Sequence, residues 1–247
     1  MRASVFGIFL ILFAILGGSP GALGKNPGSG LAGSDHDFSG IPVGGGAVTG
    51  LCTFCHTPHQ ALESTLNQNH TLSNLTFRWC GQTETRYGTP LPVIPPDYRG
   101  PSKICLGCHS RSVTVGDIGW FDGRAWTGGL TLDTKMKGGA ARSDGCMDHP
   151  HNNHPLALPY PYQGQAGTYN GVTNGNAATG NFEPDPTIFG LRLFREQPGR
   201  GIEAGPVIGQ TGIECSTCHD PHNGPSVGGG EFLRGSGNLC QKCHKDE

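Results

Sequence analysis

This 247-residue sequence has no cluster of basic residues, few methionines and only one long apolar run. Lysine and arginine number 17 against 19 aspartates and glutamates, and they form no basic stripe that would attract a phosphate backbone. After Leu16 no apolar run approaches the length of a transmembrane helix. We therefore expect neither nucleic acid as a partner nor a membrane span once the N-terminal segment is removed.

The apolar run Val5–Leu16 follows Arg2 and precedes a stretch of small residues. This order is typical of a secretory signal peptide, and about a dozen apolar residues are too few to cross a bilayer. We expect a signal peptide over residues 1–24, cleaved after Gly24, and an exported domain over residues 25–247, extracellular or alternatively periplasmic. A retained N-terminal anchor is the other interpretation.

Glycine and proline are abundant, with 42 and 19 copies, about a quarter of the chain and the level at which composition alone suggests low complexity. Ten cysteines contradict that interpretation. Residues 160–187 have the polar, glycine-rich composition of a surface loop, and Ile188–Phe194 alternates like a strand. We expect a mainly irregular, coil fold with short α-helices at the cysteine motifs, a few short β-strands and a core made by cofactors.

Eight of the ten cysteines form four copies of Cys-x-x-Cys-His, the attachment signature of c-type haem. Two thiols bond to the vinyl groups of one porphyrin, and the adjacent histidine becomes an axial ligand of its iron. Zinc or disulfide sites are the alternative, but zinc does not require a histidine directly after the second cysteine. The predicted attachment residues of four haems are Cys52, Cys55, His56, Cys105, Cys108, His109, Cys215, Cys218, His219, Cys240, Cys243 and His244.

Each iron also needs a second axial ligand, normally methionine or histidine. Met1 leaves with the signal peptide, so only Met136 and Met147 remain, whereas seven histidines lie outside the motifs. Because histidines outnumber methionines in this way, we expect a histidine ligand on both sides of every iron. Two imidazoles saturate the metal and leave no position for a substrate, which predicts an electron carrier and not an enzyme.

Two of these histidines, His59 and His222, lie three residues after a motif histidine. A spacer of three residues at about 3.5 Å each is too short to pass around a porphyrin edge. Neither histidine can therefore ligate the haem of its own motif, and each must serve a different haem or none. His149 and His151 crowd against His154, and we expect them to be bystanders. The predicted distal ligands are His36, His59, His70, His154 and His222, one more than four irons need.

The motifs alternate in type, because residues 52–59 and 215–222 read CxxCHxPH, whereas residues 105–109 and 240–244 lack the second histidine. This alternation suggests haem pairs over residues 52–109 and 215–244 within a single tetrahaem domain. Cys80 and Cys146 lie outside the motifs and form either a disulfide or two free buried thiols.

The sequence contains five characteristic segments in a fixed order: HDF (36–38), CTFCHTPH (52–59), NHTLS (69–73), NHPLALPY (153–160) and CSTCHDPHN (215–223). This layout resembles the polymerising multihaem c-type cytochromes that build extracellular electron-conducting filaments, most closely their tetrahaem branch. The C-terminal part is also similar to the widespread doubled CxxCH module.

The resemblance implies a coil fold wrapped around a chain of haems. It also implies that one histidine, His59 first and His36 second, ligates a neighbouring subunit's haem and links copies head to tail. The expected function is electron transfer within such a filament, with redox proteins or extracellular acceptors as partners. A soluble periplasmic tetrahaem shuttle and a multihaem reductase subunit are the alternatives.

Overall fold

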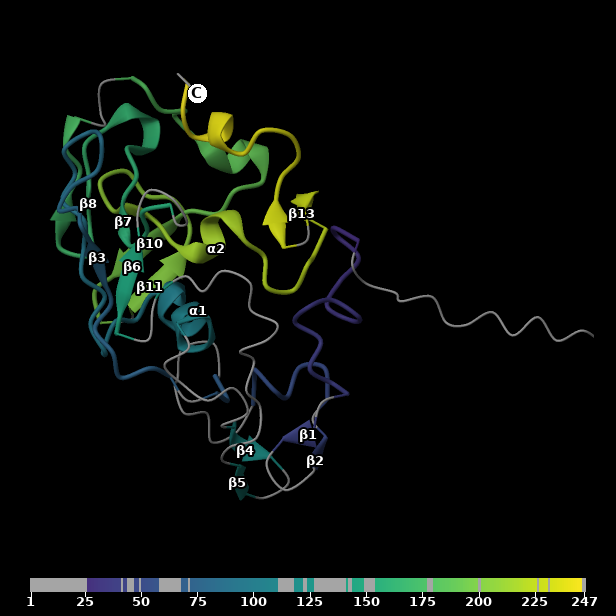
Figure 1. Ribbon diagram of the computed structural model, residues 1–247. Coiled ribbons are helices and arrows are strands. Elements are labelled where there is room, and N and C mark those ends of the chain that lie inside the picture. Colours follow the sequence, from purple (N-terminus) through teal and green to yellow (C-terminus); the bar gives the residue numbers. More distant parts are fainter. Residues whose placement is uncertain are drawn as a thin grey trace, which may run out of the picture.

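The structure is a computed structural model of the chain, shown in Figure 1. It describes residues 26–40, 42–43, 47–48, 50–57, 68–70, 72–110, 118–121, 124–126, 141, 144–148, 154–176, 180–199, 201–225, 227–230 and 232–245. The expected signal peptide, and His59, His149 and His151, lie outside these residues.

The described residues form small, mostly antiparallel sheets. The largest has the strand order β11-β10-β12-β7, with bounds Gly201–Ala204, Phe194–Gln197, Thr211–Ile213 and Leu158–Pro159. The antiparallel two-stranded sheets are β1 Pro42–Val43 with β2 Ala47–Val48, β4 Ile118–Phe121 with β5 Arg124–Trp126, β8 Thr168–Tyr169 with β9 Val172–Thr173, and β13 Val227–Gly230 with β14 Leu233–Arg234.

Helical structure is short in the described part of the chain. The α-helices are α1 Pro101–His109 and α2 Cys215–Cys218, and the 3₁₀ helices are η4 Tyr162–Gly164, η6 Pro186–Phe189 and η7 Cys240–Lys242. Helices α1 and α2 lie near the centre of the molecule, beside the largest sheet (Figure 1). No helix among the described residues has the length and apolar character needed to cross a bilayer.

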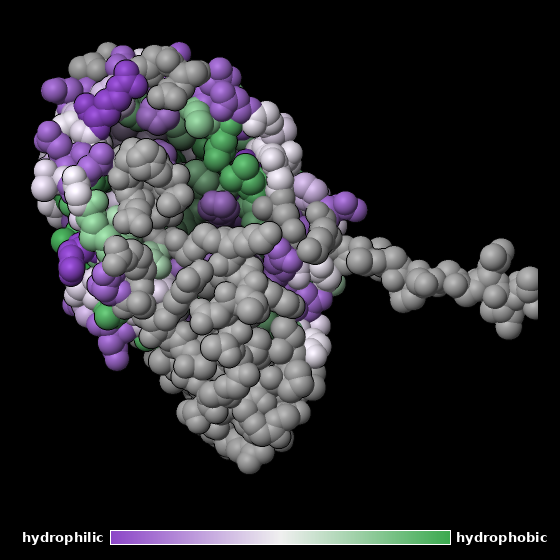
Figure 2. All heavy atoms as spheres, in the orientation of Figure 1, coloured by the Kyte–Doolittle hydropathy of each residue, from purple (hydrophilic) through white to green (hydrophobic). Residues whose placement is uncertain are grey.

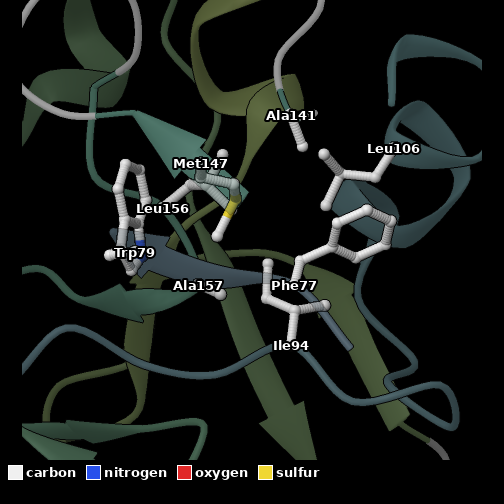
Figure 3. Packing of buried hydrophobic residues seen from close by; sticks show 8 residues of the cluster. All are labelled: Phe77, Trp79, Ile94, Leu106, Ala141, Met147, Leu156 and Ala157. Atoms are coloured by element: carbon white, nitrogen blue, oxygen red, sulfur yellow. The ribbon is translucent and has the colours of Figure 1, made fainter. Parts of the chain in front are cut away.

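The expectation of a mainly coil fold with a core made by cofactors is wrong. Side chains form a core of their own, in which Phe77, Ile94 and Leu106 are fully buried and face one another (Figure 3). Phe77 and Ile94 also exchange two backbone hydrogen bonds of 2.9 Å. The core therefore joins α1 to the segments that precede it in the chain.

Glycine is abundant here without making the fold irregular, because many glycines lie in turns between strands. In the β8–β9 hairpin, Asn170 and Gly171 both have positive φ, 49° and 70°. Asn-Gly is a strong hairpin signal, and the loop interpretation of residues 160–187 overlooked it. Tyr160 and Tyr169 of that stretch are buried, so it belongs to the packed interior.

The strand expected over Ile188–Phe194 is also misplaced. Its first residues belong to η6, which ends at Gly190 with φ at 85°, and strand β10 begins only at Phe194. A left-handed glycine stops the 3₁₀ helix and redirects the chain, so the apolar alternation spans two different elements.

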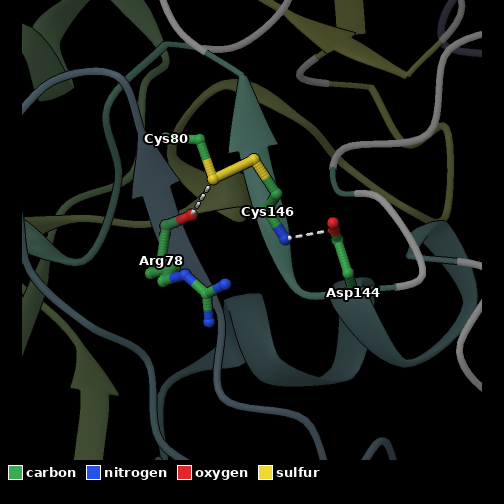
Figure 4. Close-up of a disulfide and its surroundings, with 4 residues drawn as sticks. All are labelled: Arg78, Cys80, Asp144 and Cys146. Atoms are coloured by element: carbon green, nitrogen blue, oxygen red, sulfur yellow. Dashed lines mark hydrogen bonds between the residues drawn. A yellow bond between two sulfur atoms is a disulfide. The ribbon is translucent and has the colours of Figure 1, made fainter.

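Cys80 and Cys146 form a disulfide with a Cα–Cα distance of 5.7 Å, which decides between the two alternatives left open above (Figure 4). They lie on β3 Arg78–Cys80 and β6 Cys146–Asp148, which pair in parallel. The bridge closes a loop with a sequence separation of 66 residues. It therefore ties together two segments that lie on either side of the second cysteine motif.

Candidate haem sites

All four cysteine motifs adopt a helical turn, and their eight cysteines are free thiols. The second motif ends α1, the third forms α2 and the fourth lies on η7. In the first, third and fourth motifs the histidine N–H donates to the carbonyl of the first cysteine, at 2.8, 3.0 and 2.8 Å. A turn of this kind brings the two thiols together with the histidine beside them, as attachment to one porphyrin requires.

Three motif histidines face a histidine from elsewhere in the chain. The ring centroids of His56 and His222 lie 6.0 Å apart. The corresponding distances are 6.1 Å for His109 and His36 and 6.3 Å for His244 and His154. Each facing residue is one that the sequence predicts as a distal ligand.

These distances fit an iron held between two imidazoles. A metal–nitrogen bond of about 2 Å on each side and five-membered rings with bonds of about 1.3 Å put the centroids about 6.3 Å apart. Ordinary ring contacts also span centroid distances of about 4.5 to 7 Å, so the pairing of each motif histidine with a predicted ligand supports the site together with the distance. The three pairs therefore have the spacing that a bis-histidine haem needs.

Hydrogen bonds orient two of the facing rings. His36 has its Nδ1 3.1 Å from the carbonyl oxygen of Pro221, and His154 has its Nδ1 2.7 Å from that of Pro155. When Nδ1–H donates to a carbonyl, the lone pair lies on Nε2, which is the nitrogen that can bind a metal. These backbone carbonyls therefore fix the orientation of the rings of two predicted ligands.

Burial also keeps motif histidines neutral. Burial, followed by the nearby charges of His36 and His219, lowers the pKa of His109 to about 4. Burial likewise lowers the pKa of His219, with smaller contributions from His36 and Arg234. Neutral imidazole is the form that ligates iron, so both rings are held in the binding state.

His219 differs from the other motif histidines, because no histidine ring is in contact with it among the described residues. His70 is buried, and its ring lies 5.9 Å from Phe54 of the first motif. Asn69 holds it there, donating from its backbone N–H to Cys55 O at 2.9 Å and from Nδ2 to Thr53 O at 2.7 Å. The structure therefore brings His70 to the first motif, where His222 also lies.

The fourth motif is anchored by the segment that precedes η6. Glu183 N–H donates to Cys243 O at 2.8 Å. The Tyr160 hydroxyl donates to the carbonyl oxygens of both Glu183 and Cys243. The ring of Phe182 lies 4.7 Å from that of His244. Figure 2 shows a hollow with hydrophobic residues on this face of the molecule, between α2 and the C-terminal segment.

A buried cluster around Glu214, missed in the sequence, links the second and third motifs. Glu214 is the N-cap of α2 and accepts hydrogen bonds from the hydroxyls of Tyr98, Tyr169 (2.7 Å) and Ser102. The Ser102 hydroxyl in turn accepts from Cys215 N–H at 2.9 Å. The signal that could have found this cluster is the capping box, Glu214 with Thr217, just ahead of the third motif.

In the same cluster the thiols of Cys105 and Cys215 lie close enough for their interaction to raise the pKa of Cys105 and lower that of Cys215. In a loaded protein these two sulfurs would be thioether attachments of different haems. The contact therefore brings the attachment edges of the second and third sites together, and with them the two predicted haem pairs.

The described residues contain no group of three or more His, Cys, Asp or Glu side chains arranged for a metal ion. A haem iron takes only its two axial ligands from the protein, so facing histidine pairs are the arrangement that tests the fit. Comparison with protein-family models and with curated proteins finds no match. The resemblance to filament-forming cytochromes therefore stays a prediction from the motifs.

Proposed function

We propose that this protein transfers electrons through four covalently attached c-type haems with two histidine ligands each. The observation that carries this proposal is the set of three facing histidine pairs, spaced 6.0 to 6.3 Å apart, each containing one CxxCH histidine. Four haems supply reversible one-electron chemistry; the chain's own residues bind and orient them.

The proposed distal ligands follow from the pairs. His222 serves the first motif, His36 the second and His154 the fourth. In each case the ligand comes from a segment other than the motif that it completes. Such crossing ligation holds distant segments together and leaves the iron without a substrate position, so the proposed role is electron carriage and not catalysis.

The third motif is the proposed link between copies of the chain. His219 needs a ligand, and His59 and His70 are the predicted ligands not assigned above. His70 lies at the first motif, which favours His59 as the residue that crosses to a neighbouring copy. A head-to-tail contact that does not close generates a filament, so we propose an exported, extracellular, electron-conducting polymer.

Intact mass of the secreted protein, together with negative-stain microscopy, tests this proposal. Four haem additions per chain and filaments are the expected results. Four haems with discrete particles would retain electron transfer but replace the filament with a soluble shuttle. A chain secreted in folded form without haem would overturn the proposed function itself.

The bridging role of His59 has its own test. The variant His59→Ala should keep four haems but remain monomeric, because the third site loses the ligand that the neighbouring copy supplies. The matched control is His149→Ala, which removes a predicted bystander and should leave filaments intact. Filaments of unchanged length in His59→Ala would show that another residue makes the link.

A further inference from the structure

The segment that carries His36 is held at its first turn by hydrogen bonds to a single residue, Asn223. We call residues 26–40 the N-terminal arm; it runs beside β13 at the edge of the molecule (Figure 1). Its first turn packs on residues 223–225 and 227, and a Cβ on Gly28 would lie 3.2 Å from Val227 O. The arm is thus anchored at one end by the C-terminal part of the chain, and further along by the ring of Phe38, which stacks on Phe54 of the first motif at 4.3 Å.

Asn223 makes most of the hydrogen bonds in this contact. Its side chain is fully buried, and its Nδ2 donates to Asn26 O at 2.9 Å and Gly30 O at 3.2 Å, with Ser29 Oγ at 3.4 Å. Its Oδ1 accepts from Gly28 N–H at 3.1 Å. One side chain thus satisfies donors and acceptors along the first turn of the arm.

The backbone around Asn223 completes the contact. Its carbonyl accepts from Gly30 N–H at 2.9 Å, and its φ of 50° places it in the left-handed region that asparagine tolerates. Two residues earlier, the Pro221 carbonyl lies 3.1 Å from Nδ1 of His36. The turn that docks the arm is therefore also the turn that orients the ring of His36.

The ring of His36 is confined on its other sides as well. It lies 4.4 Å from the ring of Phe232, whose backbone N–H is 3.4 Å from Asn223 Oδ1, and 6.1 Å from His109. Asn223 therefore contacts both the arm that carries the histidine and the residue against which the histidine packs.

We propose that Asn223 is a positioning residue that docks the N-terminal arm and thereby presents His36 to the second haem iron. This inference rests on the proposed function. Without the Asn223 side chain, the half-buried Gly28 N–H and the Asn26 and Gly30 carbonyls lose this partner, and undocking returns them to water. The iron opposite His109 then loses its second ligand.

The test is carbon monoxide binding by the ferrous, haem-loaded protein in its assembled form, where the proposed ligand from the neighbouring copy is in place, in the variant Asn223→Gly. Glycine accepts the left-handed backbone, so this change removes the side chain without adding strain. Asn170→Gly is the matched control, since Asn170 has φ of 49° in a hairpin away from the arm. His36→Ala defines the signal of a second site that lacks its own ligand.

In the native chain and in Asn170→Gly we expect no rapid carbon monoxide binding. In Asn223→Gly and His36→Ala we expect about one molecule bound per chain, because a single vacant axial position has opened. A haem count of four in every variant shows that attachment is unaffected. Circular dichroism equal to that of the native chain separates undocking of the arm from general unfolding.

The outcomes distinguish the positioning role of Asn223 from the assignment of His36 and from the proposed function. Binding in His36→Ala but not in Asn223→Gly would overturn the role of Asn223 and leave the proposed ligand in place. No binding in either variant would overturn the assignment of His36 to the second site. Binding in the native chain would contradict saturated ligation and with it the proposed electron carrier.

Discussion

The ring of His154 lies 6.3 Å from the ring of His244, and the two planes are tilted by 51°. His154 lies just before strand β7, whereas His244 follows η7 near the C-terminal end of the chain. The main sheet brings them together, because β7 pairs with β12, which leads directly into the third and then the fourth motif. A histidine pair of this kind is a product of strand pairing.

Changing this pair should alter one haem potential. We expect His154→Met to raise the midpoint potential of one haem by on the order of 0.1 V, since axial ligands set haem potentials over about 0.8 V. A spectroelectrochemical titration would resolve one component shifted upward and the others unchanged. His149→Met is the control and should leave the titration curve unchanged. A shift in this control would mean that the assignment of His154 as the ligand is wrong.

Replacing a core side chain should destabilise the protein strongly. Phe77 is fully buried, so we expect Phe77→Ala to lower the free energy of unfolding by about 3–5 kcal/mol. The nearby Val93 is 52% exposed, and Val93→Ala should change it by less than about 0.5 kcal/mol. Denaturant titrations of the loaded protein measure both. Similar small losses in the two variants would indicate that cofactors, and not side chains, form the core.

Removing the disulfide should cost stability without changing the haems. The bridge closes a loop with a separation of 66 residues, and we expect Cys80→Ser with Cys146→Ser to lower the free energy of unfolding by about 2–4 kcal/mol. Thermal unfolding measures this loss, and the Soret spectrum serves as the control. A changed haem count would mean that one of these cysteines takes part in attachment.

Glu214 should make stability depend on pH. Burial raises the pKa of its carboxyl above the ordinary value of 4.5, although hydrogen bonds from Ser102, Tyr169 and Tyr98 oppose the shift. The folded state therefore binds this proton more tightly than the unfolded state. Its contribution to stability is present below pH 4.5 and is lost as pH rises through the raised pKa of the folded state.

The variant Glu214→Gln has no proton to release at this position. We expect the free energy of unfolding of the native chain to fall relative to that of Glu214→Gln as pH rises above 4.5. Denaturant titrations at a series of pH values give the difference. Glu203→Gln is the control, since Glu203 lies on the surface strand β11 with its side chain 41% exposed. Parallel pH curves for the native chain and Glu214→Gln would exclude this role.

Where sequence reasoning failed, tertiary structure supplied information that local pattern lacks. Residues 160–187 have a loop-like composition, yet Tyr169 is buried because its ring packs on Gly212 of β12, where a Cβ would lie 2.3 Å from the ring. The Glu214 cluster joins residues from three separate segments, so the capping box ahead of the third motif signals Glu214 but not its partners. The coil expectation failed because glycine-rich composition does not distinguish disorder from turns in small sheets.

The sequence by itself determined the attachment chemistry that we propose, because two cysteines three residues apart, with a histidine directly after the second, meet its requirement within one helical turn. It also restricted the distal ligands to a short set of histidines, since methionine is scarce. Only the tertiary structure decided which histidine faces which motif. That choice depends on strand pairing and on the docking of the N-terminal arm, both of which join residues far apart in the chain.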